Sequence, residues 1–150
     1  MNAELSLHQA VIATLRADVA LGALLAAHSY ATPPCPAVYD YAPQVAHPED
    51  SGAFPYVVVG DTNAIDFDTD DRDGHEFTVT LHVWDHYRGS KRAREVMDAV
   101  YGALHRKDLQ VAGQHTVYCY WEFSGAVPDT EPLVQHYATR FRIVVQAIVV

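Results

Sequence analysis

The segment at residues 54–85 constrains the fold more than any other part of the chain. A continuous apolar run at 56–60 has the length and composition of a buried strand. An acidic segment at 61–74 follows, and apolar and polar residues then alternate from 76 to 83, as in a half-buried strand. The connection is too short for a crossover helix. The two strands should therefore pair antiparallel, as a hairpin with a long acidic tip.

Two stretches have the apolar periodicity of amphipathic helices. The first covers 5–16, and Asp18 is suited to cap a second short helix that follows it. The other amphipathic stretch predicts a longer helix near 91–106, which Ser90 can cap. Its apolar positions recur at helical spacing and form one continuous face, namely Ala93, Val96, Met97, Val100, Tyr101 and Leu104.

Two more strands are expected after this helix, at 117–123 and 137–147, joined by a loop at 125–132. Prolines punctuate 31–55, which predicts a loop with at most a short extended piece at 38–41. The element order is then α-β-β-α-β-β. We expect one α+β domain over 1–150, with helices packed on one face of an antiparallel four-stranded sheet.

Charge and cysteine content exclude several classes of protein. The 150 residues carry a net charge of -9, with Lys and Arg totalling 10. Gripping duplex DNA requires a basic patch, which this composition does not supply. No apolar run approaches the roughly 20 residues that span a bilayer, and no signal peptide is evident. Cys35 and Cys119 do not make a disulfide framework, and Cys119 is expected to pack as a small hydrophobe on a strand.

The acidic segment has three interpretations. Asp66, Asp68 and Asp70 have the spacing that begins a calcium-binding loop, D-x-D-x-D. Such a loop also needs a glycine at its sixth position and an acid at its twelfth, where this chain has Asp71 and Phe77. A solvated hairpin tip is the first alternative, and a charged surface that faces a partner subunit or a lumen is the second.

Neither a metal centre nor a catalytic site is predicted. His82 and His86 could share a strand face with His75 nearby, but zinc sites need three or four ligands at defined spacing. Ser124 and His136 could form a trio with Asp129 on paper, yet no nucleophile or nucleotide-binding motif accompanies them. We therefore expect no enzyme activity and no cofactor.

Lys91, Arg92 and Arg94, in the first turn of the helix predicted near 91–106, have two interpretations. They are a solvated helix start, or they contact the acidic tip of a neighbouring copy in a head-to-tail ring. Trp84 is expected to pack under a helix or against a neighbouring subunit. The candidate interface residues are Asp66, Asp68, Asp70, Asp71, Asp73, Lys91, Arg92, Arg94 and Trp84.

In order and spacing, the chain resembles the tail terminator, or tail completion, family of long-tailed bacteriophages and gene transfer agents. The resemblance extends over most of the chain. It rests on Leu7, Leu15, Ala17 and Asp18, on 38–40 with Pro43, on the strand at 55–61, on the acidic tip, and on 81–84, 96–100, 103–104 and 140–142.

That resemblance implies a structural role in the virion tail, reached after assembly in the host cytoplasm. Members of the family form a hexameric ring that caps the tail tube, ends its polymerisation and joins it to the head-side stopper or connector, with DNA passing through the lumen. The partners would be other copies, the tail tube protein and the stopper or connector protein, with no membrane. An alternative from another class is a small α+β regulatory domain that binds a ligand or partner on its sheet.

Overall fold

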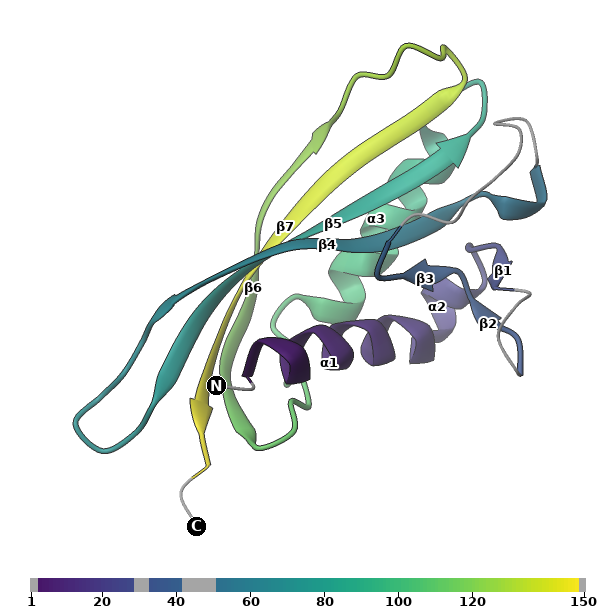
Figure 1. The fold of residues 1–150 in the computed structure, drawn as a ribbon. Coiled ribbons are helices and arrows are strands. Elements are labelled where there is room, and N and C mark those ends of the chain that lie inside the picture. The colour runs from purple at the N-terminus through teal and green to yellow at the C-terminus, as the bar shows by residue number, and fades with distance from the viewer. Residues whose placement is uncertain (1–2, 29–32, 42–50, 149–150) are drawn as a thin grey trace.

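The computed structural model of the protein describes residues 3–28, 33–41 and 51–148. Parts of the predicted proline-rich loop, at 29–32 and 42–50, lie outside the described residues. A main sheet runs the length of the molecule and the helices lie against it (Figure 1). The helices are Ala3–Ala17 (α1), Val19–Gly22 (α2) and Lys91–Leu104 (α3), with a short 3₁₀ turn at Ser51–Ala53 (η1).

Five strands form the main sheet, in the order β3-β4-β5-β7-β6. They are Val38–Tyr39 (β3), Tyr56–Asp66 (β4), Gly74–His86 (β5), Gln114–Ala126 (β6) and Val134–Ala147 (β7). β4, β5, β7 and β6 pair antiparallel, whereas β3 pairs parallel with β4. Ala27–His28 (β1) and Cys35–Pro36 (β2) form a separate small antiparallel sheet. The α+β class is confirmed.

The prediction of a four-stranded, fully antiparallel sheet was wrong, because it omitted β3. This strand is only two residues long, so its sequence is too short to show an alternating pattern. It is held by contacts distant in sequence. The Val57 amide donates to the Ala37 carbonyl at 3.0 Å, and the Arg16 guanidinium donates to the Val38 carbonyl at 2.7 Å.

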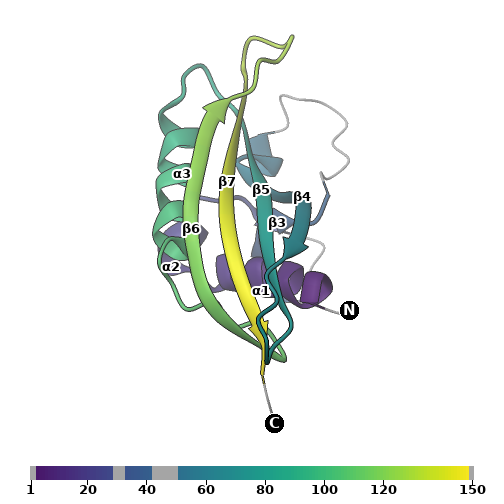
Figure 2. The same cartoon turned by 90° about the vertical axis from the view of Figure 1, so that its left-hand side faces the viewer.

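The α-helices α1, α2 and α3 cover one face of the sheet, and among the described residues no α-helix lies on the other face (Figure 2). The odd-numbered residues of β5 from Phe77 to Asp85 point toward the helices and are buried, as the alternation predicted. The largest fully buried side chains of this core include Leu7, Leu15, Phe77, Leu81, Leu104, Phe141 and Ile143. Within residues 3–28, 33–41 and 51–148, the opposite face of the sheet is therefore left without a layer of α-helices.

The predicted loop at 61–74 is in large part strand. β4 continues to Asp66, so that only 67–73 form the tip of the hairpin. The sequence here favours a loop, but pairing across the ladder overrides that preference: Asn63 lies opposite Thr78 and Ile65 opposite Glu76. The β4–β5 hairpin consequently extends well past the helices (Figure 1).

The two predicted helix caps differ in outcome. Asp18 caps α2 as predicted, because its carboxylate accepts the Leu21 amide at 2.9 Å. Ser90 stands at the cap position of α3 but makes no side-chain cap bond. Its hydroxyl instead accepts a hydrogen bond from Arg94 Nε at 3.0 Å. In the described residues, no helix is long and apolar enough to cross a membrane.

Candidate functional site

Two of the acidic residues at the hairpin tip shape the turn. The Asp66 carboxylate accepts the Asp68 amide at 3.2 Å, and the Asp68 carboxylate accepts the Gly74 amide at 2.8 Å. The Phe67 amide donates to the Gly74 carbonyl at 3.0 Å and closes the ladder. These are the local side-chain-to-backbone bonds by which aspartates stabilise turns. Asp66 and Asp68 thus stabilise the turn. From the sequence they were predicted only as interface candidates.

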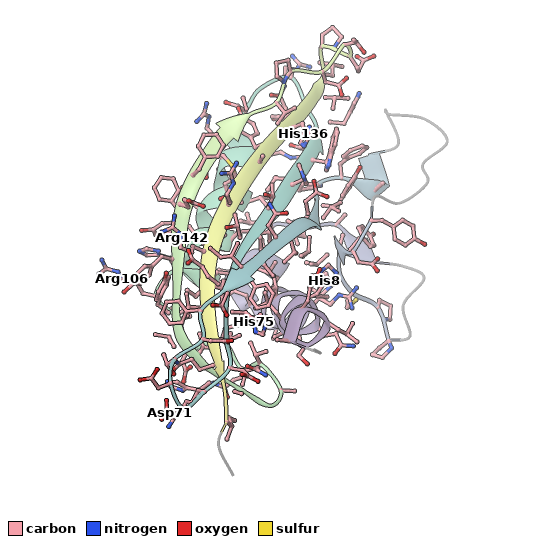
Figure 3. All side chains as sticks on the ribbon, turned by 60° about the vertical axis from the view of Figure 1, so that its left-hand side comes forward. His8, Asp71, His75, Arg106, His136 and Arg142 are labelled. Carbon is pink, nitrogen blue, oxygen red and sulfur yellow. The ribbon has the colours of Figure 1, made fainter. Side chains whose placement is uncertain are left out.

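The other three acids, Asp70, Asp71 and Asp73, are exposed at the end of the hairpin. Asp71 accepts the Thr69 hydroxyl at 3.0 Å and lies 3.9 Å from the Arg72 guanidinium. Figure 3 shows Asp71 at the far end of the molecule from His136. One arginine cannot neutralise this group, so the tip carries a net negative charge that faces solvent in the isolated chain.

The arrangement does not resemble a calcium loop. Among the described residues, no three His, Cys, Asp or Glu side chains are grouped so as to hold a metal ion. An open depression at the base of the tip is lined by Asp66, Asp68 and Asp73, together with Ala64, Ile65 and His75. The carboxylates of Asp66 and Asp68 each accept a hydrogen bond from a backbone amide of the turn.

The predicted basic cluster lies at the opposite end of β5 from the acidic tip, and its cations have partners within the chain. Lys91 is 3.8 Å from Glu95, one helical turn away. Arg94 donates to Ser90, and its guanidinium lies 5.3 Å from the centre of the Tyr137 ring. These exposed contacts are individually weak.

Arg92 has a stronger attachment. Its Nη2 lies 2.8 Å from Oδ1 of Asp85, which is completely buried and also accepts the His86 amide at 2.9 Å. The second carboxylate oxygen, Oδ2, has no hydrogen-bond partner. Burial raises the pKa of Asp85, and the Arg92 charge partly offsets that rise. Arg92 therefore joins α3 to β5, and this buried ion pair was missed because Asp85 alternates onto a face that looks apolar.

Trp84 lies on the helix-free face, so the expectation that it packs under a helix was wrong. Its ring stacks on that of His136 on β7, with centroids 3.7 Å apart. On β4, the centroid of the Tyr56 ring lies 6.5 Å from that of Trp84. Phe54 and Val58 complete a second, smaller apolar cluster there. A partner subunit at this position remains a proposal.

His136 belongs to a histidine pair that sequence reasoning did not find. His82 Nδ1 and His136 Nε2 are 2.8 Å apart, although the residues are 54 positions apart in sequence. Burial lowers the pKa of His136 to about 4, with the neighbouring His82 as a further cause, and burial also lowers the pKa of His82. In the register of β5 and β7, His136 lies opposite Trp84, two residues along β5 from His82, and this places the two imidazole rings next to each other. That register is not visible in the sequence.

The trio considered for nucleophilic catalysis is not assembled. Ser124 accepts the Trp121 indole N–H at 2.8 Å and donates to the Thr139 hydroxyl at 2.9 Å. His136 instead faces His82, as described above. Cys119 is buried, and burial raises its thiol pKa to about 12, so it packs as the small hydrophobe that was predicted.

An aromatic strip on β6 was also missed. Tyr118 and Tyr120 stack at 4.6 Å, the Arg140 guanidinium lies 5.5 Å from the Phe123 ring, and that of Arg106 lies 6.0 Å from the Tyr120 ring. We call these five residues the β6 platform. A strand was predicted at 117–123, but only the structure shows that β6 is an edge strand without a further strand beyond it among the described residues.

Comparison with known proteins identifies the family. The profile described as tail completion protein gp17 matches residues 9–146, which is nearly the whole chain. The chain belongs to this tail completion family. A relative, the tail completion protein gp17 of Bacillus phage SPP1, is 29% identical over 94 residues, which make up 61% of this chain and 68% of that protein.

The fold is shared with a solved particle. One chain in the structure of the virion of a native gene transfer agent superposes with a TM-score of 0.78 at 24% identity, covering 97% of this chain and 98% of that one. As a tail completion family member, the protein is a structural component of the virion tail. The resemblance drawn from the sequence is therefore confirmed at the level of the family.

Proposed function

We propose that the protein forms a hexameric ring on the finished tail tube, where it ends polymerisation and joins the tube to the head-side stopper or connector. DNA would pass through the lumen of this ring. The observation that carries the proposal is the family match across residues 9–146. It covers the second half of α1, all of α2 and α3, and the four long strands apart from the last residue of β7, so the match extends over the fold rather than over one motif.

The shape of the chain supports a role in assembly. The β4–β5 hairpin projects beyond the helices (Figure 1), and its acids are exposed. Large apolar side chains are also exposed on the sheet, among them Tyr120 and Phe123. Exposed aromatic residues beside charged ones are typical of protein–protein contact surfaces. The alternative of a regulatory domain with a small-molecule ligand needs an enclosed apolar pocket. The depression at the hairpin base is open and acidic, and does not favour that alternative.

Electron microscopy of tail tubes assembled with and without this protein tests the proposal. Purified tube subunits should polymerise to uncontrolled lengths alone, and addition of this protein should stop growth and leave one extra ring at a single end of each tube. Continued elongation at saturating protein, with no closed annulus on any tube, would refute the proposal. A tube preparation incubated with an unrelated acidic protein of similar size controls for a nonspecific charge effect.

A further inference from the structure

We infer that the β6 platform receives the acidic hairpin tip of a neighbouring copy, so that ring contacts form between Arg106 of one subunit and Asp70, Asp71 and Asp73 of the next. This inference rests on the proposed ring and specifies its contact surfaces. It differs from the prediction made from the sequence, in which the first turn of α3 accepted the acidic tip.

Among the described residues, several cations of this chain are already paired with carboxylates of the same chain, whereas Arg106 is not. Arg92, Lys91 and Arg142 all have carboxylate partners in their own chain, the last of these contacting both Glu76 at 3.1 Å and Glu122 at 2.8 Å. In the part of the chain that the structure describes, Arg106 has no ion pair. Its guanidinium lies 6.0 Å from the centre of the Tyr120 ring. Arg106 and the adjacent Lys107 are both exposed.

The backbone fixes Arg106 in an unusual conformation. Its φ is 58°, and it is the one residue other than glycine with a positive φ among the described residues. It follows His105 at the C-terminal cap of α3, in the place where glycine usually ends a helix. The Arg106 amide donates to the Cys119 carbonyl at 2.7 Å, which attaches this residue to the edge of β6. A long cationic side chain therefore projects from the edge of the sheet, as Figure 3 shows.

The two surfaces also match in apolar character. On the platform, Tyr120 is 46% exposed and Phe123 is 48% exposed. On the hairpin arm that carries the acidic tip, Ile65 is 61% exposed and is the second-last residue of β4. Contact between an aromatic strip and this isoleucine would remove both from water, and the ion pairs would then form at a partly desolvated rim.

The placement of the surfaces favours head-to-tail association. β4 and β6 lie at opposite sides of the sheet (Figure 2), so the acidic arm and the basic platform of one copy cannot meet each other. A two-fold pairing of unlike charges would need both patches within one self-complementary interface, whereas head-to-tail pairing lets patches on opposite sides of the sheet meet two different neighbours. Repetition of such a contact generates a ring when the rotation between copies closes.

Single-stranded nucleic acid is another occupant that aromatic and arginine side chains can suit. The charge of the chain disfavours it, because the net charge is -9 and Glu76 and Glu122 neutralise Arg142 on the same face. Binding of a fluorescent oligothymidine to the wild-type chain, lost in Arg106→Glu, would contradict the inference.

A charge exchange tests the contact directly. Self-association of the protein alone is measured by sedimentation velocity over a concentration series. Ring formation on tube ends is scored by electron microscopy. Arg106→Glu with Lys107→Glu should raise the dissociation constant at least tenfold, and so should Asp70→Arg with Asp71→Arg. Placing all four changes in one chain should restore assembly, because the exchanged charges on the two sides of each head-to-tail contact are again opposite in sign. Failure of the combined variant to recover, while both parents are folded, would overturn the inference.

Two controls separate the possible failures. Arg106→Gly removes the side chain at a backbone conformation that glycine prefers, so it should weaken assembly without lowering the melting temperature. Lys91→Glu with Arg94→Glu reverses the other cationic group and should leave assembly unchanged. Rings that tolerate Arg106→Glu but not the α3 reversal would overturn the inference and preserve the proposed function. Absence of any wild-type ring, alone or on tubes, would refute both.

Discussion

Replacement of Arg92 by methionine should expose the energetic role of the buried ion pair. Asp85 is fully buried, and in the described part of the chain Arg92 is its one cationic hydrogen-bond partner, at 2.8 Å. The substitution keeps most of the aliphatic stem and removes the charge. It leaves a carboxylate beneath α3 with one backbone amide, that of His86, as its remaining donor.

The expected cost is about 3 kcal/mol of unfolding free energy. Removing one partner of a buried pair costs about 3–5 kcal/mol, because the other charge stays in a medium that does not solvate it. The lower end applies here, since the Arg92 side chain is 39% exposed and its charge is already partly screened by water. For a domain of this size such a loss lowers the melting temperature by roughly 6–12 °C.

Asp85→Asn should cost less, about 1 kcal/mol or below. Burial raises the pKa of Asp85, which means that the folded chain disfavours its ionised form even with Arg92 present. An amide removes that penalty and leaves a half-exposed arginine that water can solvate. The double variant should therefore be more stable than Arg92→Met alone, and a double-mutant cycle in urea measures the coupling.

The pH dependence has a definite sign. Without Arg92 the pKa of Asp85 rises further, so its proton is bound more tightly in the folded chain than in the unfolded one. Stability from that proton is present at low pH and is lost as pH rises through the folded pKa. The deficit of Arg92→Met relative to wild type should shrink as pH falls from 7 toward the ordinary carboxyl range. A deficit below about 0.5 kcal/mol at pH 7, or one that grows on acidification, would refute this reasoning.

Three further changes test other parts of the structure by urea unfolding. Gly102→Ala, where an added Cβ meets nothing within 4 Å, should stabilise α3 by about 0.5–1 kcal/mol; a loss would contradict its open position. Gly74→Ala should cost about 1–3 kcal/mol because its Cβ would overlap the Phe67 carbonyl, whereas the matched Gly89→Ala meets no atom within 4 Å and should be neutral. Acidification from pH 6.5 to about 4 should cost roughly 1 kcal/mol through His136, whose pKa burial lowers to about 4, and His136→Gln should abolish that loss.

The sequence predicted the elements whose burial is periodic. Alternation in β5 identified Phe77, Val79, Leu81 and Val83 as core residues, and all four are fully or almost fully buried. The helical spacing of α1 and α3 was equally informative, because each helix buries one face. Strand β3 was expected only as an extended piece at 38–41 and not as a member of the sheet, and the second half of β4 was expected as loop. Their strand conformation comes from pairing with another strand, β3 with β4 and the end of β4 with β5, which no local pattern records.

The candidate site was predicted only as a list of charges. A count of aspartates cannot separate Asp66 and Asp68, whose carboxylates accept amides of the turn, from Asp71, which faces solvent. A count of cations likewise cannot separate Arg92, bound to a buried acid, from an arginine without an ion pair. In both cases the deciding fact is the position of a hydrogen-bond partner, and tertiary structure sets that position.

The backbone conformation of Arg106 is the observation that distinguishes it from the other exposed arginines. Glycine at the end of α3 would adopt the observed φ of 58° without strain, whereas a side chain there costs about 1 kcal/mol. The hydrogen bond from the Arg106 amide to the Cys119 carbonyl forms whatever the side chain. Within the chain, the Arg106 guanidinium lies 6.0 Å from the Tyr120 ring and has no carboxylate partner among the described residues. The proposed contact with a neighbouring copy would supply that partner. The acidic hairpin of the next copy offers the charge that such a contact needs.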